Sequence, residues 1–134
     1  MALVDSNIIL DYLTEDPVWA AWSLTQLNRV AATGQLLIND IVYAEVSIEY
    51  DRMEDLDRML ADVGFVLDPI PREALFLAGK AYKQYRAFGG KRTSILPDFF
   101  IGAHAATIGR PLLTRDTRRY RTYFPRLALI SPDA

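Results

Sequence analysis

Cysteine is absent from the chain, and histidine occurs once, at position 104. The absence of thiols excludes disulfides, thiolate-bound zinc and cysteine nucleophiles, and it suits a reducing compartment. A single histidine without a Gly-x-Ser-x-Gly elbow argues against a serine hydrolase triad. His104 falls on an apolar face with Phe100, Ile101 and Ile108. A hydrogen-bonded core position is therefore favoured for His104 over a ligand role.

Long apolar runs and glycine-rich nucleotide motifs are also absent. No apolar run approaches the ~18 residues of a membrane-spanning helix. Neither Gly-x-Gly-x-x-Gly nor the P-loop pattern occurs. The first ten residues contain an acid and no leading Lys or Arg, unlike a signal peptide. Phosphatases that form an aspartyl-phosphate usually carry an Asp-x-Asp motif after a strand. Here Asp5 is followed by Ser6 and Asn7, so the second acid of that motif is missing. We therefore expect a cytoplasmic protein with no membrane segment.

The 134 residues, 51% of them hydrophobic, fit one domain spanning residues 1–134. Apolar segments that indicate strands alternate with segments that indicate helices. The expected strands are 1–5, 35–39, 65–70, 111–116 and 127–131. The expected helices are 6–13, 17–34, 40–64 (as one or two helices), 72–90 and 97–109, with a loop at 91–96. This alternation predicts an α/β domain with a central, mostly parallel five-stranded sheet and helices on both faces.

Aspartates stand at the ends of two expected strands and at the start of one helix. Asp5 and Asp116 follow strands, and ligands of open parallel sheets bind beyond the carboxyl ends of strands. Each could equally be a structural cap. Asp98 opens the helix 97–109, where an acid favours the positive helix end by about 0.3–1 kcal/mol. Below it lies a face of small residues that we expect to pack closely against a neighbouring backbone: Gly102, Ala105, Ala106 and Gly109.

A fourth acid is ambiguous from periodicity. Glu45 and Glu49 share one stripe of the helix that begins at residue 40, together with Arg52. The stripe could face a pocket, or it could be an ordinary solvated surface with a Glu49–Arg52 pair. Helical spacing does not decide between these interpretations.

Four stretches together resemble PIN-domain ribonucleases, specifically VapC-type toxins of type II toxin–antitoxin systems. They are VDSNIILDYL, YAEVS, LPDFFIGAHA and LLTRDTRRYRTYFPRLALISP, and the resemblance runs from Met1 nearly to the end. It implies a single PIN-like domain and a metal-dependent endoribonuclease held inactive by a cognate VapB-type antitoxin. Some members carry another acid after the TRD aspartate, whereas this chain has Thr117, Arg118 and Arg119. That departure argues against a fully occupied second metal site.

The resemblance also assigns residues. It implies a catalytic set of Asp5, Glu45, Asp98 and Asp116, and so it selects Glu45 over Glu49. Asp5, Asp98 and Asp116 would hold the metal, and Glu45 would position or activate water. Ser6, Asn7 and Thr114 would support them. By the same resemblance, the products should carry a 5′-phosphate and a 3′-hydroxyl.

Physical chemistry explains why such a set needs a cation. Two carboxylates about 5 Å apart repel by roughly 3 kcal/mol at an effective dielectric of 20. Oxygen-only ligands favour Mg²⁺ or Mn²⁺ over zinc. Such an ion lowers the pKa of a bound water and stabilises charge on a phosphodiester, so neither a histidine nor a covalent intermediate is required.

Positive charge is clustered although the net charge is −2. Residues 110–134 contain six arginines and two aspartates. An RNA backbone could be held by the arginines nearest Asp116, and unpaired bases could stack on tyrosines that could equally be core residues. The candidate arginines are Arg115, Arg118, Arg119 and Arg121. The candidate tyrosines are Tyr82, Tyr85 and Tyr120.

Partners follow from the resemblance alone. An antitoxin would occupy a groove between helices, for which Trp19, Trp22 and Leu27 are candidates that could equally be core residues. A homodimer is expected. Two alternatives stay open at this point: a non-catalytic PIN-like module that binds RNA or protein, and another Mg²⁺-dependent phosphohydrolase.

Overall fold

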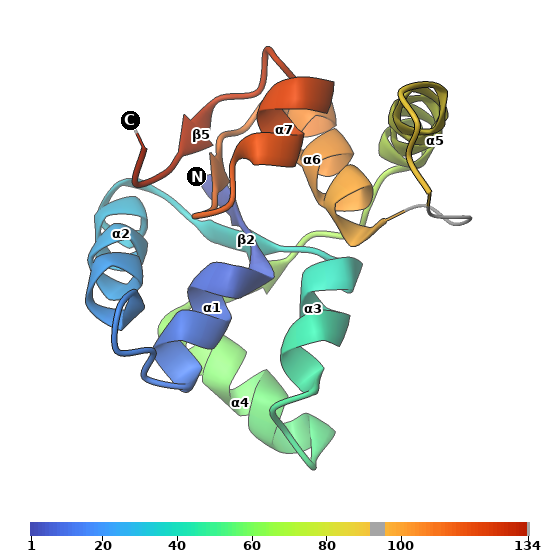
Figure 1. Ribbon diagram of the computed structural model, residues 1–134. Helices are drawn as coiled ribbons and strands as arrows, with labels where there is room; N and C mark the ends of the chain where they lie inside the picture. Colours follow the sequence, from blue (N-terminus) through green and yellow to red (C-terminus); the bar gives the residue numbers. More distant parts are fainter. Residues whose placement is uncertain (92–95, 134) are drawn as a thin grey trace.

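A five-stranded sheet, with every strand pair parallel, runs through the computed structural model, which describes residues 1–91 and 96–133 (Figure 1). Residues 92–95 of the predicted loop lie outside the described part. The strands are β1 Ala2–Val4, β2 Leu36–Ile38, β3 Phe65–Leu67, β4 Leu112–Leu113 and β5 Leu129–Ile130. The helices are α1 Ser6–Leu13, α2 Ala20–Thr33, α3 Asp40–Ser47, α4 Met53–Val63, α5 Arg72–Ala87, α6 Pro97–Ile108 and α7 Arg118–Tyr123. The predicted α/β class and five-stranded sheet are confirmed.

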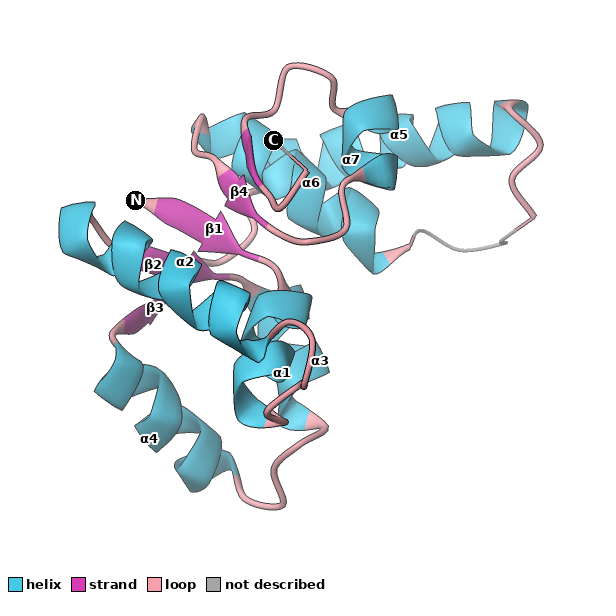
Figure 2. Cartoon of the chain, turned by 60° about the vertical axis from the view of Figure 1, so that its left-hand side comes forward, coloured by secondary structure: helices cyan, strands magenta, loops and turns pink. Residues whose placement is uncertain are grey.

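The strand order is β3-β2-β1-β4-β5, so the chain reverses its direction across the sheet between β1 and β4. Right-handed crossovers in this order place α1–α4 on one face and α5–α7 on the other. Figure 2 shows the sheet between these two groups of helices. The carboxyl ends of β1 and β4 therefore lie side by side at a topological switch point, where ligands of open α/β sheets bind.

The segment 40–64 forms two helices, which is one of the two predicted arrangements. The helix α2 begins at Ala20 rather than Pro17, because Asp16 caps a turn by accepting hydrogen bonds from the backbone N–H groups of Val18 and Trp19. The helix α7 was not predicted. Its polar sequence, RRYRTY, carries no apolar periodicity, and its burial comes from one residue, Tyr120, which is 1% exposed.

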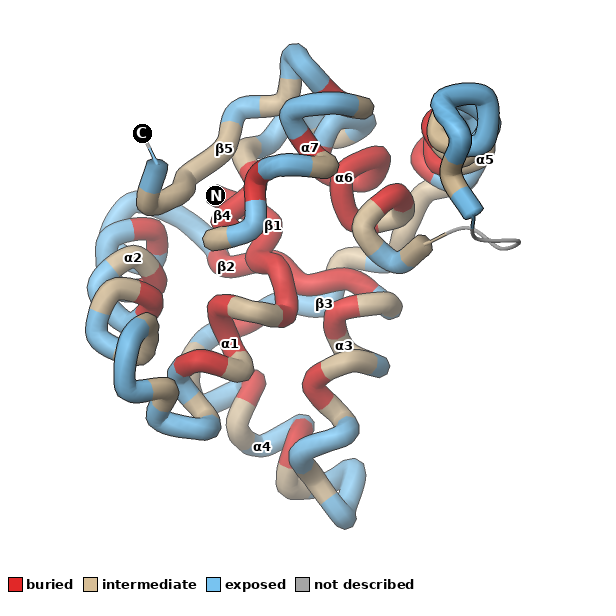
Figure 3. Tube along the Cα trace, in the orientation of Figure 1, coloured by how far each residue is buried: buried red, intermediate tan, exposed pale blue. Residues whose placement is uncertain are grey.

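The core fills both faces of the sheet, with the strands β1, β2 and β4 buried and most exposed residues on the outer helix surfaces (Figure 3). At Gly102 the bare face of α6 packs against aromatic side chains and not, as predicted, against backbone, while Ala106 and Gly109 of the same face are exposed. A Cβ on Gly102 would lie 2.6 Å from the Phe124 ring and 3.0 Å from Tyr120 Cδ1. The glycine is therefore required for α7 and the segment after it to approach α6.

His104 is a fully buried core residue with both ring nitrogens bonded, as the apolar face predicted. Asn39 accepts the Val42 backbone N–H through Oδ1, so its amide group donates to His104 Nδ1 at 3.1 Å. Nε2 then carries the proton and donates to Asp68 Oδ2 at 2.7 Å. Because Asn39 caps α3 and His104 belongs to α6, this chain of bonds joins the two helices that carry Glu45 and Asp98. Within the described residues, no helix has the length and apolarity to cross a membrane.

Candidate functional site

Asp5 lies at the centre of the switch point, directly after β1, and is 4% exposed. Its Oδ1 accepts the Ser6 backbone N–H at 2.7 Å, which caps α1. Its Oδ2 accepts two hydroxyl groups, Thr114 Oγ1 at 2.9 Å and the Tyr120 hydroxyl at 2.8 Å. The carboxylate is thus both a structural cap and a buried anion held by four elements of the chain.

The turn after β4 is built around the Thr114 hydroxyl, which is fully buried. This hydroxyl accepts the Asp116 backbone N–H at 3.1 Å and the Asn7 side-chain amide at 3.3 Å. Because the Thr114 oxygen accepts these two bonds, its single proton can be donated to Asp5 Oδ2. The arrangement ties the Thr-Arg-Asp turn to α1, and the charge of the exposed Asp116 acts on Asp98.

Glu45, on α3, faces the same end of the sheet. Ser6 Oγ donates to Glu45 Oε1 at 3.0 Å and also lies 3.5 Å from Asp5 Oδ1. Ser6 therefore bridges the two acids. Glu49 comes after the end of α3 and is exposed, so the geometry selects Glu45 where helical spacing did not.

Asp98, in the first turn of α6, makes its shortest described side-chain contact with an arginine. Arg119 Nη1, on α7, donates to Asp98 Oδ2 at 3.0 Å. The Asp98 side chain does not cap α6. The adjacent residues Arg119 and Tyr120 thus contact two different acids of the cluster, Asp98 and Asp5.

Electrostatic coupling shows that the acids belong to one cluster. Burial raises the pKa of Asp5 from 3.8 to about 6, against the lowering effect of the Tyr120 and Thr114 hydroxyls, and the Asp98 charge raises it further. Burial and then the Asp98 charge raise the pKa of Glu45. Burial raises the pKa of Asp98 despite Arg119, and Asp116 adds to that rise. The fold holds these carboxylates against their mutual repulsion.

The cluster has the donor chemistry for a hard divalent cation. All its donors are oxygens, and Asp5 is a buried anion whose partners are neutral hydroxyl and amide groups. Across residues 1–91 and 96–133, however, no three His, Asp or Glu side chains converge closely enough to hold a metal as they stand. The residues therefore fit such an ion chemically, and side chains must move for three of them to reach it.

A family model for the PIN domain matches residues 2–125. The chain belongs to the PIN domain family. This confirms the family predicted from the sequence.

Solved structures with the same fold come from toxin–antitoxin complexes. VapBC2 from Rickettsia felis, bound to a DNA fragment from its promoter, has a TM-score of 0.74 and 18% identity and covers 97% of both chains. A toxin–antitoxin complex from Klebsiella pneumoniae has a TM-score of 0.72, 20% identity and 98% coverage of both chains. FitAcB from Neisseria gonorrhoeae has a TM-score of 0.69, 19% identity and 98% coverage of both chains. No curated protein sequence matches this PIN domain.

Three of the four arginines predicted to contact RNA have acidic partners within the PIN domain. Arg115 donates to both oxygens of the buried Asp11, at 2.8 and 3.0 Å, and lies over the Trp19 ring. Arg119 contacts Asp98. Arg121 Nη2 lies 3.8 Å from a carboxylate oxygen of Asp133. Arg118 is exposed, and its guanidinium makes no hydrogen bond or ion pair with any described residue.

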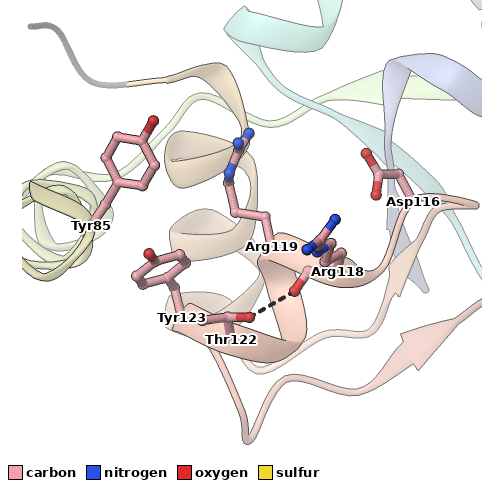
Figure 4. Close-up of a pocket in the computed structure, with 6 residues that line it drawn as sticks. All are labelled: Tyr85, Asp116, Arg118, Arg119, Thr122 and Tyr123. Atoms are coloured by element: carbon pink, nitrogen blue, oxygen red, sulfur yellow. Dashed lines mark hydrogen bonds between the residues drawn. The ribbon is translucent and has the colours of Figure 1, made fainter. Parts of the chain in front are cut away.

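A cavity of about 310 Å³ opens beside the acid cluster, between α5 and α7. Figure 4 shows two tyrosines on one side of it, Asp116 on the other, and two arginines between them. Its lining residues are Tyr85, Asp116, Arg118, Arg119, Thr122 and Tyr123. Of the two roles left open for Tyr120, the core role holds, because its ring is buried and its hydroxyl binds Asp5. Tyr82 packs against the core and does not line this cavity.

A second, smaller cavity of about 230 Å³ lies between α1, α2 and α4. Leu27, a predicted groove residue, lines it, with the partly exposed Tyr12 and Leu24 at its edge. Trp22 packs against the core and Trp19 against Arg115, and neither lines this groove. Of the three residues predicted to form a groove, only Leu27 lines this one.

Sequence reasoning missed the roles of Tyr120 and Arg119 as acid-contacting residues and of Asp11 as the partner of Arg115. No periodicity signals them, because each depends on α7 or α1 folding back across the switch point. The Tyr120 hydroxyl bonds Asp5, which lies 115 residues earlier in the chain, so local spacing gives no sign of this contact.

Proposed function

We propose that this PIN domain is a metal-dependent endoribonuclease. The observation that carries the proposal is the buried Asp5, coupled electrostatically to Asp98 and supported by Ser6 and Thr114 at the switch point. Capping α1 explains the bond to the Ser6 N–H, but it does not explain why a carboxylate with a pKa raised to about 6 is buried next to further acids. A cation-binding role accounts for it.

Each residue then has a defined task. Asp5, Asp98 and Asp116 would hold Mg²⁺ or Mn²⁺, which supplies a nucleophilic water and charge stabilisation for the phosphodiester. Thr114 and Tyr120 keep the Asp5 carboxylate ionised and oriented by donating to Oδ2. Glu45, fixed by Ser6, positions the attacking water and takes its proton. Asn7 holds the Thr114 hydroxyl in place.

Arg118 is the residue best placed to hold a phosphate of the RNA. It lines the cavity next to Asp116 and has no acidic partner among the described residues. Arg115 is held by the buried Asp11, so we expect it to contribute less to RNA binding than Arg118. The contact between Arg121 and Asp133 is long and exposed, and it leaves Arg121 available to a phosphate. A cytoplasmic location stays a prediction.

The experiment is RNA cleavage by the wild type, Asp98→Asn and the matched control Glu49→Gln, each with Mg²⁺, Mn²⁺ or EDTA. We expect cleavage by the wild type and the control that requires metal and leaves 5′-phosphate ends. Asp98→Asn should lose at least about 100-fold in rate, as for removal of a charged group that acts in the transition state. Equal activity in Asp98→Asn and the wild type would contradict the proposal.

We propose a toxin role with an antitoxin partner, and its support is that VapBC2, a toxin–antitoxin complex and FitAcB share this fold. A VapB-type partner would place an apolar helix in the groove between α1, α2 and α4. We expect Leu24→Asp to abolish co-purification with the product of an adjacent antitoxin gene and to leave RNA cleavage unchanged. If Leu24→Asp still co-purified with the antitoxin, the groove between α1, α2 and α4 would not be the binding site. A homodimer remains a prediction, to be checked by light scattering.

One observation favours a second candidate, a PIN module that binds RNA without cutting it. Arg119 already neutralises Asp98, and three acids do not converge as they stand. RNA binding by the wild type with no cleavage in Mg²⁺ or Mn²⁺ would select this candidate. No feature of the site favours a small-molecule phosphohydrolase.

A further inference from the structure

Arg119 occupies the position at Asp98 where a cation would bind. One guanidinium nitrogen, Nη1, makes the contact with Asp98 Oδ2 at 3.0 Å. The contact is at the rim of the cluster, since the side chains of Arg119 and Asp98 are 37% and 29% exposed. A single, partly solvated charge-assisted hydrogen bond of this kind exchanges readily.

Arg119 also has partners that do not depend on Asp98. Its guanidinium carbon lies 5.8 Å from the centre of the Tyr85 ring and 5.9 Å from that of Phe99, within reach of a cation–π attraction. Arg119 also lines the cavity between α5 and α7, together with Tyr85 and Arg118. Figure 4 shows its side chain between the tyrosines and Arg118. The cavity and the Tyr85 ring therefore offer the Arg119 guanidinium an alternative position if it leaves Asp98.

The ion pair between Arg115 and Asp11 is more buried and makes more hydrogen bonds than the pair between Arg119 and Asp98. Arg115 contacts both oxygens of Asp11, whose side chain is 3% exposed and also accepts the Ser23 hydroxyl at 2.9 Å. Arg119 makes one bond to a more exposed acid that other carboxylates surround. Of the two arginines, only Arg119 is arranged for displacement.

We propose that Arg119 is a displaceable counter-cation: it holds Asp98 while the acid cluster lacks a divalent ion, and it moves into the cavity between α5 and α7 when the ion binds. A divalent ion and a guanidinium cannot share Asp98 without strong repulsion. Once released, Arg119 joins Arg118 as a second phosphate contact. Metal binding thereby prepares the site for RNA, and only this last step rests on the proposed function.

The first test measures Mn²⁺ affinity without RNA, by electron paramagnetic resonance. Arg119→Ala removes the competing cation, so we expect its Kd for Mn²⁺ to fall by roughly fivefold. Arg119→Lys keeps a charge that can make the same single contact and should stay near the wild type. Arg121→Ala, which removes a charge from the same helix, is the matched control and should change the Kd by less than about twofold.

The result that would overturn the proposal is a Kd for Arg119→Ala that is equal to or higher than that of the wild type, because Arg119 would then support Asp98 rather than compete for it. Nitrogen-15 spectra of the wild-type arginine side chains test the same point without a substitution at Arg119. Saturating Mg²⁺ should shift the Arg119 signal and leave that of Arg115 in place. An unmoved Arg119 signal would also overturn the proposal.

The RNA step is tested in a Glu45→Gln background, where cleavage is slow. Mg²⁺ should raise RNA affinity more in the protein that keeps Arg119 than in its Arg119→Ala derivative. If Mg²⁺ raised RNA affinity equally in the two proteins, the released Arg119 would not contact RNA. If the wild type never cleaves RNA while Arg119→Ala binds Mn²⁺ more tightly, the nuclease proposal fails and the displacement stands.

Discussion

The Asp5 carboxylate should destabilise the metal-free protein at neutral pH, and Asp5→Asn should relieve that cost. Burial raises the pKa of Asp5 from 3.8 to about 6 in the folded protein. The folded protein therefore binds this proton more tightly than the unfolded chain does, and its stability falls as the pH rises from about 4 to 6. A shift of about two units corresponds to about 3 kcal/mol above pH 7.

Asparagine is a close stand-in for the protonated acid at this position. Its oxygen can accept the Ser6 N–H, and its amide group can donate to the Tyr120 hydroxyl. The Thr114 hydroxyl already accepts from the Asp116 N–H and from Asn7, and it can turn its proton to the Asp116 carbonyl oxygen, 3.3 Å away. The substitution thus removes the charge and keeps the bonds to Ser6 and Tyr120. We expect Asp5→Asn to exceed the wild type by up to about 3 kcal/mol at pH 7.5 and by less than about 1 kcal/mol at pH 4.

The assay is urea unfolding in EDTA at both pH values. With an m value of about 2 kcal/mol/M, the midpoint of Asp5→Asn should lie about 1–2 M higher at pH 7.5. Asp62→Asn, at an exposed position on α4, is the control and should not shift it. Mg²⁺ should stabilise the wild type and not Asp5→Asn. An Asp5→Asn protein that is no more stable than the wild type at pH 7.5, or a gain independent of pH, would refute the reasoning.

Three further outcomes follow from single contacts. Arg118→Ala should raise the KM for RNA and lower the salt dependence of binding by about one counterion while kcat holds, measured by cleavage kinetics at several salt concentrations. Arg115→Ala leaves Asp11 buried without its cation and should lower the free energy of unfolding by about 2–3 kcal/mol in urea, less than a fully buried pair would lose. Tyr120→Phe should raise the pKa of Asp5 by about one unit further in the metal-free protein, followed by carbon-13 NMR of the carboxyl group.

The fold was predictable because apolar strands alternate with capped helices, and this pattern depends on local sequence. Asp5 and Asp116 were predictable as strand-end acids by the same logic, since parallel strands bring their carboxyl ends to one edge. Glu45 was not predictable from helical spacing, which places it and Glu49 on one stripe, and only the resemblance selected it. The Ser6 hydroxyl, supplied by a different helix, distinguishes them.

The short helix α7 marks the limit of sequence reasoning. Its arginines predicted RNA contacts, yet Arg119 contacts Asp98 and Tyr120 is buried under Asp5. These roles depend on tertiary packing against Gly102, where the missing Cβ lets the ring of Tyr120 approach. Composition identifies a basic segment, and only the folded chain shows which of its charges are already neutralised.

Anomalous scattering from Mn²⁺ in crystals of the wild-type protein tests the central claim most directly. The account predicts a peak within about 2.5 Å of carboxylate oxygens of Asp5 and Asp98 or Asp116, and no such peak in Asp98→Asn crystals grown under the same conditions. If wild-type crystals soaked in saturating Mn²⁺ showed no anomalous peak at these carboxylates, the proposed metal site would be contradicted.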